Sequence, residues 1–294
     1  TTEIYTLSLH DALPIYTPAS IFEVDTISLI EPSYSDLIDE QFTYLLTTLE
    51  AEQGRLLIDE ESDPLALAVL TPNGWFAGSF HLRHPTAPLI EYFESIGGDI
   101  YQEDRDIWEQ SVREYYSLII RQEVVPALED VNPERVGMID SLLEEVWGDR
   151  SGAECLDCCC GSGVGSMVLR NRGLKPISFD IDTPLLSLGF HTGRLRPEET
   201  MCIDGSLASR FIGQTKGGLG LMFGEFNEFN RESWEMITSE LISLTEWSLI
   251  TVGTESEADQ VARWGESRHR VVEVRENTRD PIYDRFVCII EEEN

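Results

Sequence analysis

From residue 151 onward, segments with strand character alternate with segments of helical periodicity. The strand-like segments are ECLDCCC, PISFDID, TMCIDGS, GLGLMFGEF and WSLITVGT. Strands joined through helices run parallel, because each crossover returns the chain to the same end of the sheet. HRVVEVREN and YDRFVCIIEE then close the chain as an expected antiparallel pair. This order predicts an α/β fold with a mixed seven-stranded sheet and helices on both faces.

A glycine-rich turn follows the first of these strands. ECLDCCC runs into GSGVG, which opens a helix, and Asp180 ends the next strand about 20 residues on. Open α/β sheets bind ligands outside the carboxyl ends of their strands, so this combination indicates an adenosine-type ligand. Asp157 lies just before the turn and would repel a pyrophosphate by roughly 3 kcal/mol at about 5 Å. A cationic ligand without phosphate, S-adenosylmethionine, therefore fits better than a dinucleotide.

ECLDCCCGSGVGS resembles motif I of class I S-adenosylmethionine-dependent methyltransferases, and the resemblance covers about residues 135–294. It implies a Rossmann-like domain in which Asp157 lines the methionine end, Asp180 holds the ribose hydroxyls and Asp204 lies near the adenine amine. The residues expected to bind the cofactor are Asp157, Cys159, Gly161, Ser162, Gly163, Asp180, Ile181, Asp204 and Gly205. The sequence departs from the motif at Cys159, which stands where the family has its first glycine and narrows the pocket.

Several of these residues admit other roles. Asp157 fits a cap of the glycine-rich turn, Asp182 fits the cap of the next helix better than a ribose ligand, and Asp204 fits an ordinary turn. Cys155 and Cys158 have the spacing of half a structural zinc site, but no second pair follows at suitable spacing. We therefore expect no metal.

The methyl acceptor is expected beyond the fourth strand of this domain. Candidates there are Glu225 and Asn227 in GEFNEFN. Tyr283 in PIYDRF is expected to reach the same opening of the site. No Asn-Pro-Pro-Tyr pattern occurs, so amino groups of bases or of glutamine are not specially indicated. The sequence predicts a methyltransferase acting on a small-molecule or protein acceptor. The alternative is a non-catalytic S-adenosylmethionine-binding or assembly module with the same fold.

Residues 17–134 carry mostly helical signals and are expected to cover the site and shape acceptor choice. Helices are predicted in four segments, SDLIDEQFTYLLTTLEAEQG, APLIEYFESIGG, RDIWEQSVREYYSLIIRQEVV and NPERVGMIDSLLEEVWG, the last capped by Asn132. LALAVLTPNGWFAGSF predicts two strands about a turn at Pro72-Asn73-Gly74. The expected domains are thus a mostly helical region over 17–134 and a methyltransferase domain over 135–294.

The chain is strongly acidic, with 54 acidic and 21 basic residues, a net charge of −33 and only two lysines. The acidic side chains repel one another in the compact state and destabilise it, and concentrated salt screens this repulsion. This balance resembles proteins of salt-accumulating archaea, and DCCCGSG and DPIYDRF are similar to uncharacterised archaeal methyltransferase-like proteins. Neither half of the chain contains a cluster of basic residues that could bind nucleic acid at moderate salt. No apolar run reaches the roughly 20 residues that span a bilayer, so we expect a cytoplasmic protein without a membrane partner.

Residues 1–16 are expected to be no part of the fold. TTEIYTLSLHDALPI lacks the periodicity of a helix or strand and the basic region of a secretory signal. Its reverse translation resembles a short-read sequencing adapter, codon after codon. We interpret residues 1–15 as a translated artefact, with Tyr16 at the junction, and the chain as a product of assembled environmental DNA.

Overall fold

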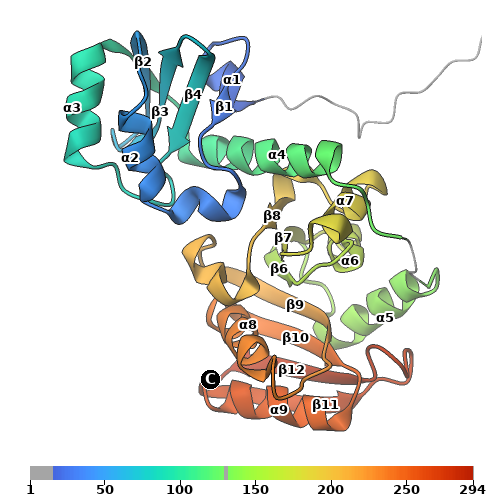
Figure 1. Cartoon of the computed structure of the whole chain (residues 1–294). Helices are drawn as coiled ribbons and strands as arrows, with labels where there is room; N and C mark the ends of the chain where they lie inside the picture. Colours follow the sequence, from blue (N-terminus) through green and yellow to red (C-terminus); the bar gives the residue numbers. More distant parts are fainter. Residues whose placement is uncertain (1–15, 129–131, 294) are drawn as a thin grey trace, which may run out of the picture. The chain divides into compact units, whose positions relative to one another are not determined.

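The computed structural model describes residues 16–128 and 132–293, and the chain divides into two compact units between Tyr116 and Ser117 (Figure 1). The division falls inside the continuous helix α4 (Arg105–Glu123), earlier than the boundary predicted at residue 135. No proline-, glycine- or polar-rich stretch marks it in the sequence. The segment interpreted as an adapter lies outside the described residues. Within the described chain, no helix is both long and apolar enough to cross a membrane.

The second unit is built on the predicted seven-stranded mixed sheet. Its strands are β6 (Glu154–Cys158), β7 (Lys175–Asp180), β8 (Thr200–Cys202), β9 (Thr215–Phe223), β10 (Thr245–Val252), β11 (Arg270–Glu276) and β12 (Phe286–Glu292). They follow the order β11-β12-β10-β9-β6-β7-β8. Neighbouring strands from β8 to β10 are parallel, and β12 pairs antiparallel with both β10 and β11. The Rossmann-like sheet and its terminal hairpin are therefore confirmed.

Helices cover both faces of this sheet. They are α5 (Arg135–Trp147), α6 (Val164–Asn171), α7 (Thr183–His191), α8 (Arg231–Ser243) and α9 (Glu255–Glu266), with short 3₁₀ turns η3 (Pro197–Glu199) and η4 (Gly205–Arg210). Leu219 of β9 packs in one apolar cluster with residues of α5 and α6. Its neighbour Gly218 faces Leu241 of α8 instead. Successive residues of a strand point to opposite faces, so α5 and α6 cover one face and α8 the other.

The central strand β9 contains three glycines because bulky neighbours occupy the space above its backbone. A Cβ on Gly217 would lie 2.1 Å from Cη2 of Trp247, and one on Gly218 would lie 2.7 Å from Cδ1 of Leu241. Trp247 is held in place by an edge-on contact with Trp147, with ring centroids 4.5 Å apart. Glycine is unfavourable in a strand interior unless another group approaches closely, which is the case here.

The first unit contains a five-stranded sheet, which corrects the expectation of a mostly helical region. Its strands are β1 (Ser28–Leu29), β2 (Gln53–Ile58), β3 (Pro64–Thr71), β4 (Gly74–Ser79) and β5 (Gly98–Gln102), in the order β1-β4-β3-β2-β5. The predicted hairpin about Pro72-Asn73-Gly74 is confirmed as β3 and β4. The edge strands β1 and β5 gain their hydrogen bonds from partners far away in the sequence, so local patterns did not indicate them.

The helices of the first unit are α1 (Pro18–Ile21), η2 (Tyr34–Ile38), α2 (Gln41–Thr47), α3 (Ala87–Ile96) and the first part of α4. The long helix predicted over residues 35–54 is thus split, and its expected stop, Gly54, lies in β2. There the Gly54 amide donates to the Gly97 carbonyl over 2.9 Å, and a Cβ on Gly54 would lie 2.9 Å from Phe93. The tertiary contact of α3 with β2 therefore decides the conformation of Gly54.

Asn132 is also placed differently from the expectation. Helix α5 begins at Arg135, and Glu134 is its N-cap residue. The Asn132 side chain accepts a hydrogen bond from the Glu134 amide at 3.0 Å, which forms a turn ahead of the helix. Asn132 therefore leads into α5 rather than capping it.

A buried ion pair stabilises the interior of the first unit. The Arg83 guanidinium pairs with the Glu31 carboxylate, and both side chains are almost fully buried. Arg83 also donates to the Thr43 hydroxyl at 2.9 Å and to the Leu37 carbonyl at 2.8 Å. Tyr116 of α4 donates to the Glu31 carbonyl at 2.9 Å. These further hydrogen bonds and the Ser79 amide, which donates to Glu31 at 3.2 Å, stabilise the pair, although Oε2 of Glu31 has no hydrogen-bond partner among the described residues.

We predict that Gly217→Ala lowers the free energy of unfolding by about 1–3 kcal/mol, because the new methyl group overlaps the Trp247 ring. Gly137→Ala, in the interior of α5 where a Cβ meets no neighbour within 4 Å, is the control and should raise stability by up to about 1 kcal/mol. Denaturant unfolding measures both. Equal effects of the two substitutions would contradict this account of β9.

Candidate functional site

The turn after β6 reverses the chain through three residues with left-handed backbone. Cys159 has φ 54°, Gly161 φ 52° and Gly163 φ 81°. The Cys160 amide donates to the Phe179 carbonyl at 3.0 Å, and the Gly163 amide donates to the Cys160 carbonyl at 2.9 Å. These bonds fix the turn against β7 and lead directly into α6. The turn thus presents backbone at the carboxyl edge of the sheet.

Cys159 occupies a conformation that favours glycine. Its left-handed φ gives a physical reason for the glycine that the resembled motif has there, since a Cβ costs roughly 1–2 kcal/mol in this region. Its sulfur lies 4.0 Å from that of Cys158. The departure from the motif therefore introduces backbone strain beside the predicted cofactor site.

Asp180 connects the turn to the end of β7. One carboxylate oxygen accepts the Gly161 amide at 2.8 Å, and the other accepts the Asp182 amide at 2.8 Å. Burial raises the pKa of Asp180, although the side chain keeps part of its surface open. Each carboxylate oxygen has a second lone pair, so Asp180 retains acceptors for the hydroxyls of a ligand.

Asp157 lies beneath the turn and is almost fully buried, with 1% of its surface exposed. It accepts a hydrogen bond from the Ser166 hydroxyl at 2.5 Å, and Ser166 in turn lies 2.7 Å from the Ser178 hydroxyl. A Cβ on Gly165 would come within 2.6 Å of the carboxylate. Asp157 thus holds the first turn of α6 through Ser166, rather than the glycine-rich turn that the sequence analysis considered. Its contact with a ligand remains a prediction.

Burial raises the pKa of Asp157 to about 6. A carboxyl group with this pKa is partly protonated near neutral pH. The repulsion energy of roughly 3 kcal/mol between Asp157 and a pyrophosphate applies to a fully ionised carboxylate, so it is a maximum value. The preference for a cationic ligand must rest on the whole carboxyl edge rather than on this residue alone.

The other predicted acids follow the next two strands. Asp182 accepts the Leu185 amide at 3.0 Å and caps α7, as expected. Asp204, after β8, accepts the Ser206 amide at 2.9 Å and caps η4. Ile181 exposes 68% of its surface between Asp180 and Asp182. The parallel strands thus bring Asp157, Asp180 and Asp204 to one edge, and only Asp180 contacts the turn backbone directly.

Two of the cysteines at this edge are favoured as neutral thiols. Burial raises the pKa of Cys158 and of Cys160 well above the ordinary value, which keeps both protonated. All six cysteines are free. Among the residues that the structure describes, no three His, Cys, Asp or Glu side chains are gathered in a way that could hold a metal ion.

The acceptor-side candidates form a loop between β9 and α8. The side-chain amides of Asn227 and Asn230 both donate to the Glu225 carbonyl at 3.1 Å. Asn227 also accepts the Phe229 amide at 2.9 Å. These amides are therefore used to shape the loop, whereas the Glu225 carboxylate is exposed. Tyr283 is exposed over 52% of its surface, on the loop before β12.

A buried relay at the ends of β9 and β10 was missed by the sequence analysis. Arg135 pairs with Asp284 at 2.8 Å, Thr251 donates to Asp284 at 2.5 Å, and the Met222 amide donates to Thr251 at 2.9 Å. Met222 adopts a left-handed φ of 57° at the end of this relay. Arg135 and Asp284 are almost 150 residues apart, and only the second lies in a motif that the sequence singles out. No local pattern could have paired them.

Solved structures similar to this chain include methyltransferases, at low identity. Magnesium protoporphyrin IX methyltransferase from Synechocystis, with bound SAM, has a TM-score of 0.44 at 13% identity, over 63% of this chain and 97% of that one. An rRNA methylase from Streptococcus thermophilus has a TM-score of 0.39 at 16% identity, over 57% of this chain and 100% of that one. The sequence matches no protein-family profile and no curated protein. Likenesses at this level assign no activity or acceptor to this chain.

We predict that Cys159→Gly raises the free energy of unfolding by about 1 kcal/mol, because glycine adopts a φ of 54° without a Cβ clash. Cys159→Ala, which removes the thiol but keeps the Cβ, is the matched control and should give no such gain. Denaturant unfolding compares the two variants. A gain of the same size in both would show that the thiol, not the backbone, is unfavourable.

Asp157 should make stability depend on pH. Its folded pKa of about 6 is above the ordinary value of 3.8, so the stabilisation from the bound proton is complete below about pH 4 and is lost as pH rises through 6. Relative to Asp157→Asn, which does not titrate, the wild type should lose up to about 3 kcal/mol of unfolding free energy between pH 4 and 8. Parallel denaturation series at several pH values measure this difference. A difference independent of pH would contradict the assignment.

Proposed function

We propose that the second unit binds S-adenosylmethionine at the carboxyl edge of β6, β7 and β8 and transfers its methyl group to a small-molecule or protein acceptor. The observation that carries this proposal is the hydrogen bond between the Gly161 amide and the Asp180 carboxylate. This bond holds the Asp180 carboxylate beside the turn. The space next to Gly161 is open, since a Cβ there would meet only Leu185 within 4 Å, at 3.9 Å.

The residues at this edge fit the cofactor in shape and charge. The open lone pairs of Asp180 suit the two ribose hydroxyls, and Asp204 on the neighbouring strand suits the adenine amine. The glycine backbone allows the methionine part to approach closely. Asp157, Asp180 and Asp204 together favour the cationic sulfonium and ammonium groups over a pyrophosphate. Arg194 donates to the Ser162 carbonyl at 2.9 Å and so keeps the middle of the turn in place.

Bound S-adenosylmethionine supplies an activated sulfonium methyl group. The chain then has to fix the geometry of the cofactor and acceptor, which can contribute roughly 7–11 kcal/mol to lowering the barrier. Asp180 and the turn hold the cofactor side. On the acceptor side, the relay from Arg135 to Met222 fixes the end of β9. Glu225 is the group proposed to accept a proton where an acceptor must lose one, because its carboxylate is exposed there.

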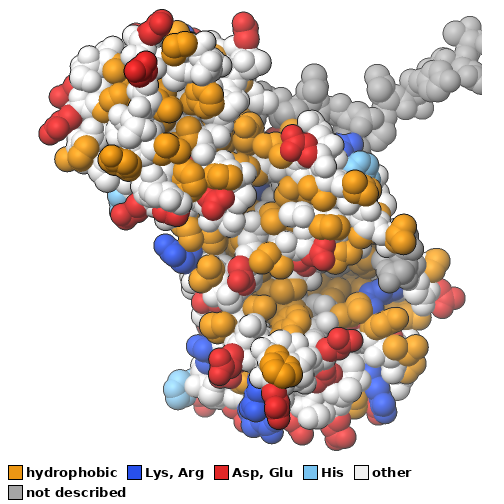
Figure 2. Space-filling model, in the orientation of Figure 1, with side chains coloured by type: hydrophobic (Ala, Val, Ile, Leu, Met, Phe, Trp, Pro, Cys, Tyr) orange, Lys and Arg blue, Asp and Glu red, His pale blue; other side chains and the backbone are white. Residues whose placement is uncertain are grey.

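The charge of the chain supports an acceptor that is not a nucleic acid. On the face shown in Figure 2, acidic side chains are scattered over both units rather than gathered in one patch. A polyanion would be repelled at moderate salt, and no basic footprint offsets this. The same acid excess supports a cytoplasmic protein of a salt-accumulating cell, with archaea as the resembled source.

The second candidate is a non-catalytic module that binds S-adenosylmethionine without turnover. The observation in its favour is that Asn227 and Asn230 use their amides within the loop, which leaves them few groups with which to polarise an acceptor. Detection of methyl transfer to any acceptor would separate this candidate from the enzyme.

We predict that S-adenosylmethionine and its demethylated product bind with micromolar affinity in molar potassium chloride, measured by calorimetry. Asp180→Ala should weaken this binding at least about tenfold, because it removes the charged acceptor beside the turn. Asp182→Ala is the matched control. It removes the cap of α7 and about 1 kcal/mol of stability, but should leave the affinity nearly unchanged.

Two outcomes would contradict the proposal. One is a folded protein that binds neither compound. The other is an Asp180→Ala variant that remains folded and binds as tightly as the wild type. Circular dichroism and denaturant unfolding of each variant distinguish lost binding from lost structure.

A further inference from the structure

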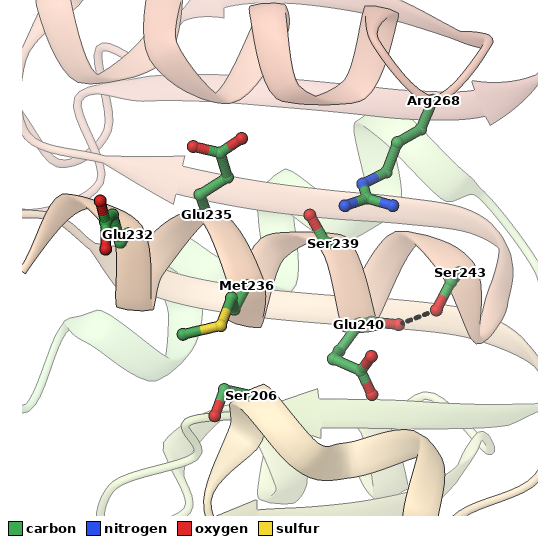
Figure 3. A pocket seen from close by; sticks show the side chains of 8 residues that line it. All are labelled: Ser206, Glu232, Glu235, Met236, Ser239, Glu240, Ser243 and Arg268. Atoms are coloured by element: carbon green, nitrogen blue, oxygen red, sulfur yellow. Dashed lines mark hydrogen bonds between the residues drawn. The ribbon is translucent and has the colours of Figure 1, made fainter.

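We propose a second ligand site, for a small zwitterion whose ammonium and carboxylate groups are separated along an aliphatic chain. It is a cavity of about 450 Å³ on the outer surface of α8, here called the α8 pocket. Its lining residues are Ser206, Glu232, Glu235, Met236, Ser239, Glu240, Ser243 and Arg268 (Figure 3). None of them belongs to the glycine-rich turn or to the acids of the proposed cofactor site. This site therefore does not depend on the proposed methyltransferase activity.

Two opposite charges face the α8 pocket without neutralising each other. Figure 3 shows the Glu235 carboxylate and the Arg268 guanidinium on the same side of α8, with Ser239 between them. Within the described part of the chain, neither side chain takes part in an ion pair. A guanidinium binds a carboxylate in bidentate fashion, and a carboxylate binds an ammonium group. A ligand that carries both charges can therefore complete both interactions at once.

The floor of the α8 pocket contains a buried hydroxyl group without a partner. Ser239 is 7% exposed, and its Oγ has no hydrogen-bond partner among the described residues. A buried polar group left unpaired costs about 1–3 kcal/mol, and most such groups in proteins are paired. A polar atom of a ligand that reaches the floor would supply the missing partner.

The remaining lining residues restrict the choice of ligand. Glu240 accepts the Ser209 amide at 2.6 Å, and the Ser243 hydroxyl donates to the Glu240 carbonyl at 2.9 Å, so these groups are already engaged. Met236, 49% exposed, offers an apolar wall for methylene groups. The charges still available are carboxylates on α8 and the single guanidinium of Arg268. This arrangement favours a zwitterion, because Arg268 alone would attract a dianion, and a dication would pair with the carboxylates but leave Arg268 without a partner.

Calorimetric titration with 6-aminohexanoate, at the lowest potassium chloride concentration that keeps the full chain folded, tests this inference. The charge controls are 1,6-diaminohexane and hexanedioate, which share the chain length but carry like charges. We expect 6-aminohexanoate to bind with millimolar affinity and each control to bind at least about tenfold more weakly. The titration contains no S-adenosylmethionine, so its result is independent of the proposed cofactor site.

Variants locate the binding. Glu235→Gln and Arg268→Gln should each weaken 6-aminohexanoate binding at least about tenfold, since each removes one charged contact. Glu255→Gln, on the exposed first turn of α9 and outside the pocket lining, is the matched control and should bind as the wild type does. Ser239→Ala should weaken binding several-fold without lowering the stability of the free protein, because its hydroxyl has no partner to lose.

Three results would overturn the inference. They are no binding of 6-aminohexanoate, binding that survives both Glu235→Gln and Arg268→Gln, and binding of 1,6-diaminohexane as tight as that of the zwitterion. A loss of stability in Ser239→Ala would likewise show that the hydroxyl has a structural partner rather than a ligand.

Discussion

The carboxylate of Asp180 is the interaction on which the geometry of the carboxyl edge depends. One of its oxygens fixes the turn after β6 through the Gly161 amide, and the other fixes the start of the segment that leads into α7 through the Asp182 amide. Two loops from different strands therefore take their positions from one side chain. Because the carboxylate is fixed from both sides, its free lone pairs have a defined direction, which is the property that a ligand site requires.

The buried acids of the second unit are satisfied in two different ways. Asp157 and Asp180 are held by hydroxyl and amide donors, which stabilise a carboxylate without cancelling its charge. Asp284 is instead paired with the buried guanidinium of Arg135. Among the described residues, the first arrangement gives Asp157 and Asp180 no ion-pair partner, whereas the second places a guanidinium beside the acid where β9 and β10 end.

The packing of the sheet also shows where glycine serves structure and where it serves the site. In β9 the glycines make room for Trp247 and Leu241, so they are fixed by neighbours on the adjacent strand and helix. In the turn, a Cβ on Gly161 would meet only Leu185 within 4 Å, so the backbone conformation of this glycine matters more than the space around it. Cys159 shows that the same backbone is reached at a cost without glycine.

Local patterns were enough to predict the strands and helices of the second unit, the turn after β6 and the cap at Asp182, because alternation, helical periodicity and capping depend on residues close together in the chain. In the first unit local patterns predicted the β3–β4 hairpin, but the edge strands β1 and β5 pair with strands distant in sequence and depend on the tertiary structure. The tertiary structure also decided that Asp157 is buried against Ser166 and that Arg135 pairs with Asp284. These features depend on contacts between remote segments, and their residues have the same local pattern whether or not the contact forms.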